Sequence, residues 1–507
     1  MSGPTHPQQG MSADKRAVLR REIERRRAAA TTVRAIQARP PGTPPVLSLA
    51  QERLWVLDQM YPGQSTYNAT LTLRLQGRLD TAALHRALDS VVARHEALRT
   101  VIRRQDDGTP AGSLLSADHG CRWEQVDLAD RVDELSGRLH ALAAQPFDLS
   151  RDVMLRASLF RLHDDTHVLI MVLHHIASDG WSRSALFDEL AEVYNATVAG
   201  RTPRLPDLPV QYGDYAAWQR GLAERGHFDR LLDFWRQELS GADLILDLPT
   251  DRPRSDVPSF LGSRLSFTDS DLGEQLRLLG RSAAATPFMT YLALTATMLH
   301  ALTGQTDFLL GCPSANRDRP ETAALIGFFV DTIVVRVPLD GNPRFLDVLQ
   351  RSREAVLRSL SNPVPFDRLV DAVRPKRIAG RNPLFQVNYR MQGAAPPPPA
   401  LDGIQATRML TDVGASRFDL AFGFVDAPGP LRGYLEFNAA LFSETTIQAW
   451  SDTVLALARA VVADPTTRLD QLVALVQAEV AARRATAGPV SSGGPRKIRR
   501  TRERNAG

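Results

Sequence analysis

Cysteine and lysine are both scarce in this chain of 507 residues. The two cysteines, Cys121 and Cys312, cannot build a disulfide framework or a four-thiolate zinc site. Their scarcity is typical of a reducing compartment, so we expect a cytoplasmic location. Only three of the 61 basic residues are lysines (Lys15, Lys376 and Lys497). None of them lies in an apolar run that would lower its pKa, which argues against Schiff-base chemistry.

Long apolar runs are missing as well. A membrane-spanning helix needs about 18 or more consecutive apolar residues, and the run from Val168 to Leu173 is far shorter. The N-terminus also lacks the apolar core of a signal peptide. We therefore expect no association with a membrane.

The signature motifs of several enzyme classes are absent. The chain has no HExxH zinc motif, no GxSxG nucleophile elbow, no phosphate loop ending in GK[ST] and no convincing dinucleotide fingerprint. These absences argue against a zinc protease, a serine hydrolase, a nucleotide hydrolase and a dinucleotide-dependent oxidoreductase. We expect the chain itself to bind no metal and no cofactor.

The net charge of +4 is unevenly distributed. Residues 1–39 carry nine basic and three acidic residues, and residues 483–507 carry eight basic residues and one acidic residue. The part between them is mildly acidic. Basic ends favour RNA, DNA or an acidic protein as a partner, but solvated termini explain them equally well, and nucleic acid is not the partner we expect.

The chain divides into four parts. Residues 1–45 combine a basic helix, predicted over residues 13–29, with a Pro-rich linker, and form a candidate docking element. Residues 46–222 and 223–482 each mix strand and helix patterns, which predicts two α/β lobes of similar ingredients. Residues 483–507 are a basic tail.

Apolar periodicity predicts the main elements of both lobes. In the first lobe, strands are expected at Leu71–Leu75 and Val168–Leu173, and helices at Thr81–Ala97 and Ser184–Val198. In the second lobe, the pattern predicts helices over 271–284, 287–302 and 345–360, and strands over 263–267, 307–311, 332–337, 385–389 and 435–438. A Pro run at 396–399 marks a loop or an extended bridge.

The segment His174-His175-Ile176-Ala177-Ser178-Asp179-Gly180-Trp181-Ser182 carries the chemistry. It follows a buried strand and precedes a helix, which is where rigid scaffolds place catalytic groups. Adjacent residues at a strand end point in opposite directions, so one histidine packs inward and the other faces a cavity. A neutral imidazole and a backbone N–H at a helix start suit acyl transfer. A purely structural His pair beside an Asp-Gly turn is the alternative.

At this point the sequence resembles the condensation domain of nonribosomal peptide synthetases over about residues 46–480. The family signature HHxxxDG is matched by His174, His175, Asp179 and Gly180. Six further motifs resemble those of the family in the same order: residues 48–55 (SLAQERLW), 94–100 (RHEALRT), 212–218 (YGDYAAW), 326–332 (IGFFVDT), 365–367 (PFD) and 381–386 (RNPLFQ). Asp331 departs from the pattern, because the family usually has Asn there.

The resemblance implies a fold and a set of partners. Condensation domains are similar to chloramphenicol acetyltransferase, with two such lobes forming a V-shaped pseudodimer around an active-site tunnel. Two carrier proteins, which belong to other synthetase subunits or modules, bring their substrates on phosphopantetheine arms. The product expected from the resemblance is an amide between a donor acyl or peptidyl thioester and an acceptor amine.

The resemblance also implies roles for the signature residues. His175 is expected to be the catalytic histidine, acting as a base or as a positioning group, and His174 to support it. Gly180 is our candidate oxyanion donor. Asp179 is expected to pair with an arginine rather than to transfer protons, and the candidate partners are Arg94, Arg99 and Arg317.

Three further residues belong to the expected site. Trp218 and Trp181 are expected to pack around it. At Asp331 a carboxylate replaces an amide, and a carboxylate can only accept hydrogen bonds where an amide also donates them. Retention of both histidines separates the chain from heterocyclising relatives, which have DxxxxD instead. The signature sequence of this chain is most similar to that of domains that join two L-residues.

Two other functions remain open. A free-standing acyltransferase would pass a carrier-bound acyl group to a soluble alcohol or amine, forming an ester or an amide. A non-catalytic recruitment module is the other alternative, since some family members have lost activity. The donor, the acceptor, the product and the oligomeric state do not follow from the sequence.

Overall fold

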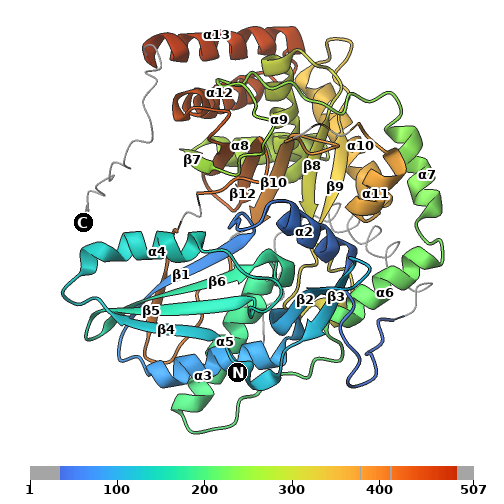
Figure 1. The fold of residues 1–507 in the computed structure, drawn as a ribbon. Helices are drawn as coiled ribbons and strands as arrows, with labels where there is room; N and C mark the ends of the chain where they lie inside the picture. The colour runs from blue at the N-terminus through green and yellow to red at the C-terminus, as the bar shows by residue number, and fades with distance from the viewer. Residues whose placement is uncertain (1–34, 377, 379, 394, 412–413, 488–507) are drawn as a thin grey trace.

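The computed structural model describes residues 35–487 except 377, 379, 394 and 412–413. The predicted helix at 13–29 and most of the tail therefore lie outside the described residues. Two mixed β-sheets, each packed with helices, form the two halves of the molecule in Figure 1. Two hydrophobic cores correspond to these halves, and a third small cluster lies around Trp235 and Phe385.

The first sheet has five strands in the order β11-β1-β6-β5-β4. Its centre is β6, a continuously buried apolar strand, which pairs antiparallel with β1 on one side and β5 on the other. The strands span Asn68–Gln76 (β1), Arg122–Asp127 (β4), Leu155–His163 (β5), Thr166–His174 (β6) and Gln405–Met409 (β11). A separate hairpin pairs β2 (Thr100–Arg104) with β3 (Pro110–Leu114).

Six helices accompany the first sheet and the connection to the second. The apolar stripes of α3 and α5 enter the same core, which explains why their sequences are amphipathic. The helices are α2 (Leu49–Met60), α3 (Thr81–Arg94), α4 (Leu135–Ala144), α5 (Ser182–Val198), α6 (Tyr212–Glu224) and α7 (Asp229–Glu238). In Figure 1, α6 and α7 run along one side of the molecule from the first half to the second.

The second sheet has six strands in the order β7-β13-β12-β10-β8-β9. They span Gly262–Asp269 (β7), Leu309–Ser314 (β8), Asp331–Arg336 (β9), Val387–Gly393 (β10), Leu420–Asp426 (β12) and Leu431–Asn438 (β13). The surrounding helices are α8 (Leu272–Ser282), α9 (Pro287–Thr303), α10 (Phe345–Ser361), α11 (Phe366–Val373), α12 (Glu444–Ala463) and α13 (Leu469–Ala487).

Helix α9 is buried on nearly every side and shows how local sequence sets an element. Thr286 caps its N-terminus by accepting a hydrogen bond from the Met289 N–H, and Pro287 occupies the first turn, where its missing N–H costs nothing. Gly304 ends the helix in a left-handed conformation with φ 73°.

The division at residue 222 needs one correction. After β10, the chain passes through the Pro run and adds β11 to the edge of the first sheet, beside β1, before it returns to β12. The buried segment Leu325–Phe329 also packs in the first core. The assignment of residues 223–482 to one lobe as a block is therefore wrong. Strand periodicity could not show this, because it does not reveal which sheet edge a strand joins. The boundary at 482 also falls inside α13.

Candidate active site

The signature loop joins the central strand of the first sheet to α5. The backbone N–H of His175 donates to the Tyr67 carbonyl at 2.8 Å, so pairing continues to the last residue before the loop. A short 3₁₀ turn, His175–Ala177, follows, and α5 starts at Ser182. The loop is therefore anchored at both ends to rigid elements.

His174 faces the protein interior, with 4% of its surface exposed. Its Nδ1 accepts a hydrogen bond from the Ile176 N–H at 3.1 Å, and its ring lies against Phe147 and Tyr67. Burial, together with the positive charges of Arg417 and Arg156, lowers the pKa of His174 to about 3. His174 is thus a neutral packing residue, as expected for the inward member of the pair.

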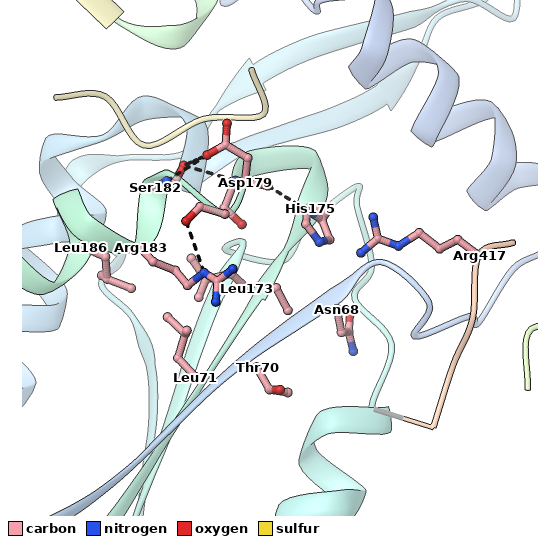
Figure 2. A pocket seen from close by; sticks show the side chains of 13 residues that line it. Asn68, Thr70, Leu71, Leu173, His175, Asp179, Ser182, Arg183, Leu186 and Arg417 are labelled. Atoms are coloured by element: carbon pink, nitrogen blue, oxygen red, sulfur yellow. Dashed lines mark hydrogen bonds between the residues drawn. The ribbon is translucent and has the colours of Figure 1, made fainter. Parts of the chain in front are cut away.

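His175 faces a cavity of about 190 Å³. Its Nδ1 lies 3.1 Å from the Ser178 carbonyl oxygen (Figure 2). A carbonyl only accepts, so Nδ1 carries the proton and the Nε2 lone pair is left for a ligand. Burial and then the nearby Arg417 guanidinium hold the pKa of His175 well below its ordinary value. At neutral pH the ring is therefore uncharged and can accept a proton.

The cavity is lined by β1, the end of β6, the signature loop and the start of α5, and one residue comes from the second half of the sequence. Figure 2 shows the Arg417 side chain extending toward His175 from the segment before β12. The lining residues are Asn68, Ala69, Thr70, Leu71, Leu173, His175, Ser178, Asp179, Gly180, Ser182, Arg183, Leu186 and Arg417.

Asp179 holds the loop together and does not face the substrate with a free oxygen. Its Oδ1 accepts from the backbone N–H groups of Trp181 and Ser182, and its Oδ2 accepts from the Phe329 N–H at 3.1 Å. Oδ1 also receives Arg317 Nη2 at 3.1 Å, and both side chains are almost fully buried. Asp179 therefore orients the loop through several fixed donors.

Of the three candidate partners for Asp179, the structure brings only Arg317 to it. Arg94 pairs instead with Glu189, with 3.0 Å between Arg94 Nε and the carboxylate. Arg99 donates to the Leu115 carbonyl at 2.8 Å. Arg94 and Arg99 are therefore wrong as candidate partners, because a carboxylate and a backbone carbonyl already bind their guanidinium groups.

The Gly180 backbone is accessible from the cavity. Among the described residues, no acceptor is recorded for its N–H, whereas its carbonyl receives Arg183 Nε at 3.3 Å. The role of Gly180 as an oxyanion donor stays a prediction. A Cβ built on Gly180 lies 3.2 Å from Arg183 Nη2, so the guanidinium sits directly against this backbone.

The two tryptophans behave differently. Trp218 packs beside Tyr215, with the Arg319 guanidinium 4.5 Å from its ring centroid, but it does not line the cavity. Trp181 is 56% exposed. The expectation that Trp181 packs around the site is therefore wrong, since Trp181 precedes α5 at the surface.

Asp331 lies at the start of β9, outside the cavity lining. Its carboxylate accepts from the N–H groups of Thr332 and Phe366, so both contacts use an acceptor, which Asp and Asn share. Burial raises the pKa of Asp331 to about 6, and the nearby Arg53 opposes this rise. The acid is thus close to its titration range at neutral pH.

Sequence reasoning missed the two arginines of the cavity, Arg183 and Arg417. Arg183 directly follows the signature segment, as the second residue of α5, so its place in the sequence already put it near the site. Arg417 had no such signal, because it is 242 positions from His175 in the chain. Among the described residues, no three His, Cys, Asp or Glu side chains gather as a metal centre requires.

The family model of the condensation domain matches residues 44–482. The chain belongs to the condensation-domain family. One of the linear gramicidin synthase proteins of Brevibacillus parabrevis is 36% identical over 442 residues, which are 85% of this chain and 9% of that protein. Phosphinothricin tripeptide synthetase PhsC of Streptomyces viridochromogenes is 38% identical over 479 residues, covering 90% of this chain and 43% of that protein.

This condensation domain therefore spans less than half the length of those curated relatives. Among solved structures, the X-domain from teicoplanin biosynthesis is 30% identical with a TM-score of 0.81, covering 86% of this chain and 99% of that one. The first condensation domain of the calcium-dependent antibiotic synthetase has a TM-score of 0.70 at 20% identity, covering 85% of this chain and 99% of that one, and shows the fold alone. The acetyltransferase-like α/β fold is confirmed. Among the described residues, no helix combines the length and apolar character of a membrane span.

Proposed function

We propose that this condensation domain catalyses amide formation between two substrates held on carrier proteins of a nonribosomal peptide synthetase. The observation that carries the proposal is the His175 ring, whose proton on Nδ1 is bound by the Ser178 carbonyl and whose Nε2 is left for the substrate. The carriers, which belong to other synthetase subunits or modules in the cytoplasm, would present each substrate on a phosphopantetheine arm.

The acceptor amine attacks the donor thioester carbonyl, forming the C–N bond and a tetrahedral oxyanion. The Gly180 N–H, with the Arg183 charge beside it, stabilises this oxyanion. Collapse breaks the C–S bond and releases the thiol of the donor arm. The proton lost by the nitrogen passes through His175 Nε2 to the departing sulfur, so atoms and charge balance.

The lowered pKa of His175 favours the positioning role over that of a base acting before attack. So weak a base does not remove a proton from a free ammonium group before attack. It accepts a hydrogen bond from the neutral amine and takes the proton after the C–N bond has formed, when the nitrogen is far more acidic. Positioning of two tethered reactants contributes up to ~10 kcal/mol, and proton transfer contributes about 10²–10⁴-fold.

The test is reconstitution with loaded donor and acceptor carriers from the same biosynthetic cluster, followed by mass spectrometry of the carrier-bound product. We expect His175→Ala to lower the rate by about 10²–10⁴-fold without lowering the melting temperature. His174→Ala is the matched control, because it opens a cavity in a buried cluster and lowers the melting temperature.

Two outcomes would overturn the proposal. Transfer to free amines or alcohols with no loaded acceptor carrier would indicate a free-standing acyltransferase. Unchanged product formation in His175→Ala, together with binding of another protein, would indicate a recruitment module. The solved complex of the teicoplanin X-domain with OxyB shows a similar structure bound to another protein, but the complete His175 site favours catalysis here.

A further inference from the structure

We propose that Arg417 binds a carboxylate carried by one of the two substrates, so that this domain selects an acidic acyl or aminoacyl group. The inference rests on the proposed function and specifies its substrate class. The first observation behind it is the position of the Arg417 side chain at the cavity.

The backbone on both sides of Arg417 is firmly held. The Ser416 N–H donates to the Phe260 carbonyl at 2.9 Å, and Phe418 packs against Phe385. Asp419 forms a bidentate ion pair with Arg254. The neighbours of Arg417 are thus fixed in the second half of the molecule, while its own side chain reaches the cavity of the first (Figure 2).

Within the part of the chain that the structure describes, no acidic side chain forms an ion pair with the Arg417 guanidinium, and the acid within its electrostatic range, Glu436, is paired with Arg390. No hydrogen bond or ion pair is recorded for it there, and its recorded contact is with the Tyr67 ring, 5.3 Å from the centroid. Three other part-buried arginines are each paired with an acid: Arg317 with Asp179, Arg53 with Asp367 and Arg390 with Glu436. A ring contact of this kind does not use the N–H groups of the fork, which match a carboxylate in bidentate geometry.

The cavity itself favours an anion. Arg417 and Arg183 both bring positive charge to it, and both contribute to lowering the pKa of His175, which shows that they lie within electrostatic range of the ring. The acidic residue in the lining, Asp179, is already bound to Arg317 and four other donors. A bound carboxylate would supply the missing counter-charge in a confined site.

A substrate carboxylate fits this position better than the phosphate of a pantetheine arm. The thioester reacts beside His175, and the phosphate lies at the opposite end of the arm from the thioester. A carboxylate on the substrate itself, in contrast, travels with the reacting carbonyl or amine into the cavity. The donor and the acceptor are the two sources of this one chemistry, and the experiment separates them.

The experiment measures condensation rates with matched pairs of loaded carriers. Glutamyl and glutaminyl groups, and aspartyl and asparaginyl groups, are placed first on the donor and then on the acceptor, with a neutral alanyl group opposite. We expect the wild type to prefer the acid over its amide by about 10-fold or more on one of the two sides, since a site built for a polar group rejects the analogue that lacks it.

Arg417→Met is expected to abolish this preference by lowering the rate with the acid far more than the rate with the amide. Arg417→Lys keeps the charge without the fork and should retain part of the preference. Arg432→Met removes an exposed arginine outside the cavity lining and serves as the charge control. Thermal unfolding of each variant shows that the fold is kept.

Two results would overturn the inference. The first is a wild type that uses acid and amide equally on both sides. The second is an Arg417→Met variant that slows all substrates by one factor, which would mean that Arg417 acts on the reacting centre common to all of them. Either result, obtained with condensation that still depends on His175, leaves the proposed function standing. Loss of His175 dependence would contradict the proposed function instead.

Discussion

Asp179 and Arg317 form a buried ion pair that joins the signature loop to the second half of the sequence. Arg317 Nη2 lies 3.1 Å from Asp179 Oδ1, and the arginine and aspartate side chains are only 3% and 1% exposed. Arg317 also donates to the carbonyls of Thr322 and Leu325, and its guanidinium lies 4.2 Å from the Phe329 ring centroid. The pair thus fixes the signature loop against a segment far away in the chain.

Removal of either partner of this ion pair is expected to lower the stability of the protein, and to affect its activity only as a consequence. We expect Asp179→Ala to lower the free energy of unfolding by about 3–5 kcal/mol, because it leaves a buried guanidinium without its counter-charge. Urea unfolding followed by circular dichroism measures this loss. The surface pair of Glu134 and Arg138 is the control, where Glu134→Ala should cost less than ~1 kcal/mol. A stable Asp179→Ala variant that lacks activity would contradict the structural role and assign Asp179 to the chemistry.

The pH profile should report the lowered pKa of His175. An ordinary histidine loses its free lone pair as pH falls through about 6.5. Since burial and Arg417 hold the pKa of His175 well below that value, protonation of His175 should slow condensation only below about pH 6. Any loss of rate at higher pH should follow the acceptor amine, which reacts in its neutral form. In Arg417→Met one cause of the lowering is removed, so the acid limb should move to higher pH. Initial rates between about pH 4.5 and 8 test this. An unchanged acid limb in the variant would show that Arg417 does not lower the pKa of His175.

Asp331 should make stability depend on pH in the opposite sense to an ordinary acidic residue. Its folded pKa is about 6 and its unfolded pKa lies near 3.8. The folded state therefore binds a proton that the unfolded state releases, and stability declines as pH rises from about 4 to about 6. Asp331→Asn keeps an acceptor for the Thr332 and Phe366 N–H groups but does not titrate.

We therefore expect Asp331→Asn to be more stable than the wild type at neutral pH and to unfold with a smaller dependence on pH between about 4 and 6. Denaturant midpoints at several pH values provide the measurement. Asp118→Asn is an exposed acidic control, and the pKa of Asp118 is lowered rather than raised. A destabilised Asp331→Asn at neutral pH would show that attraction to Arg53 outweighs the cost of burying the charge.

Deletion of the basic ends should show whether condensation requires them. Residues 1–34 and 488–507 lie outside the described part and supply none of the contacts described above. We expect the trimmed chain to condense substrates at the wild-type rate with soluble carriers and to lose retention on a heparin column. Binding to nucleic acid would weaken steeply as salt rises, whereas a docking role would appear as weaker use of one carrier. Loss of condensation with both carriers would contradict this expectation.

The sequence by itself determined the secondary structure around the site and the opposite orientations of the two histidine side chains. A continuous apolar run became the central strand, and alternation at its end predicted one histidine facing inward and the other facing a cavity, because these periodicities are local properties of the backbone. The family resemblance implied that His175 is the one at the cavity. Such signals need no knowledge of distant residues.

Only the tertiary structure decided which distant residues meet. Three arginines were equally plausible partners for Asp179, and burial beside Phe329 selected Arg317. Strand β11 joined a sheet far from its neighbours in the chain, and Arg417 reached His175 across 242 positions. Pairings of this kind depend on which surfaces the folded lobes bring together and on which charges remain unpaired there. Local periodicity predicts neither of these, because it reports only on neighbouring residues.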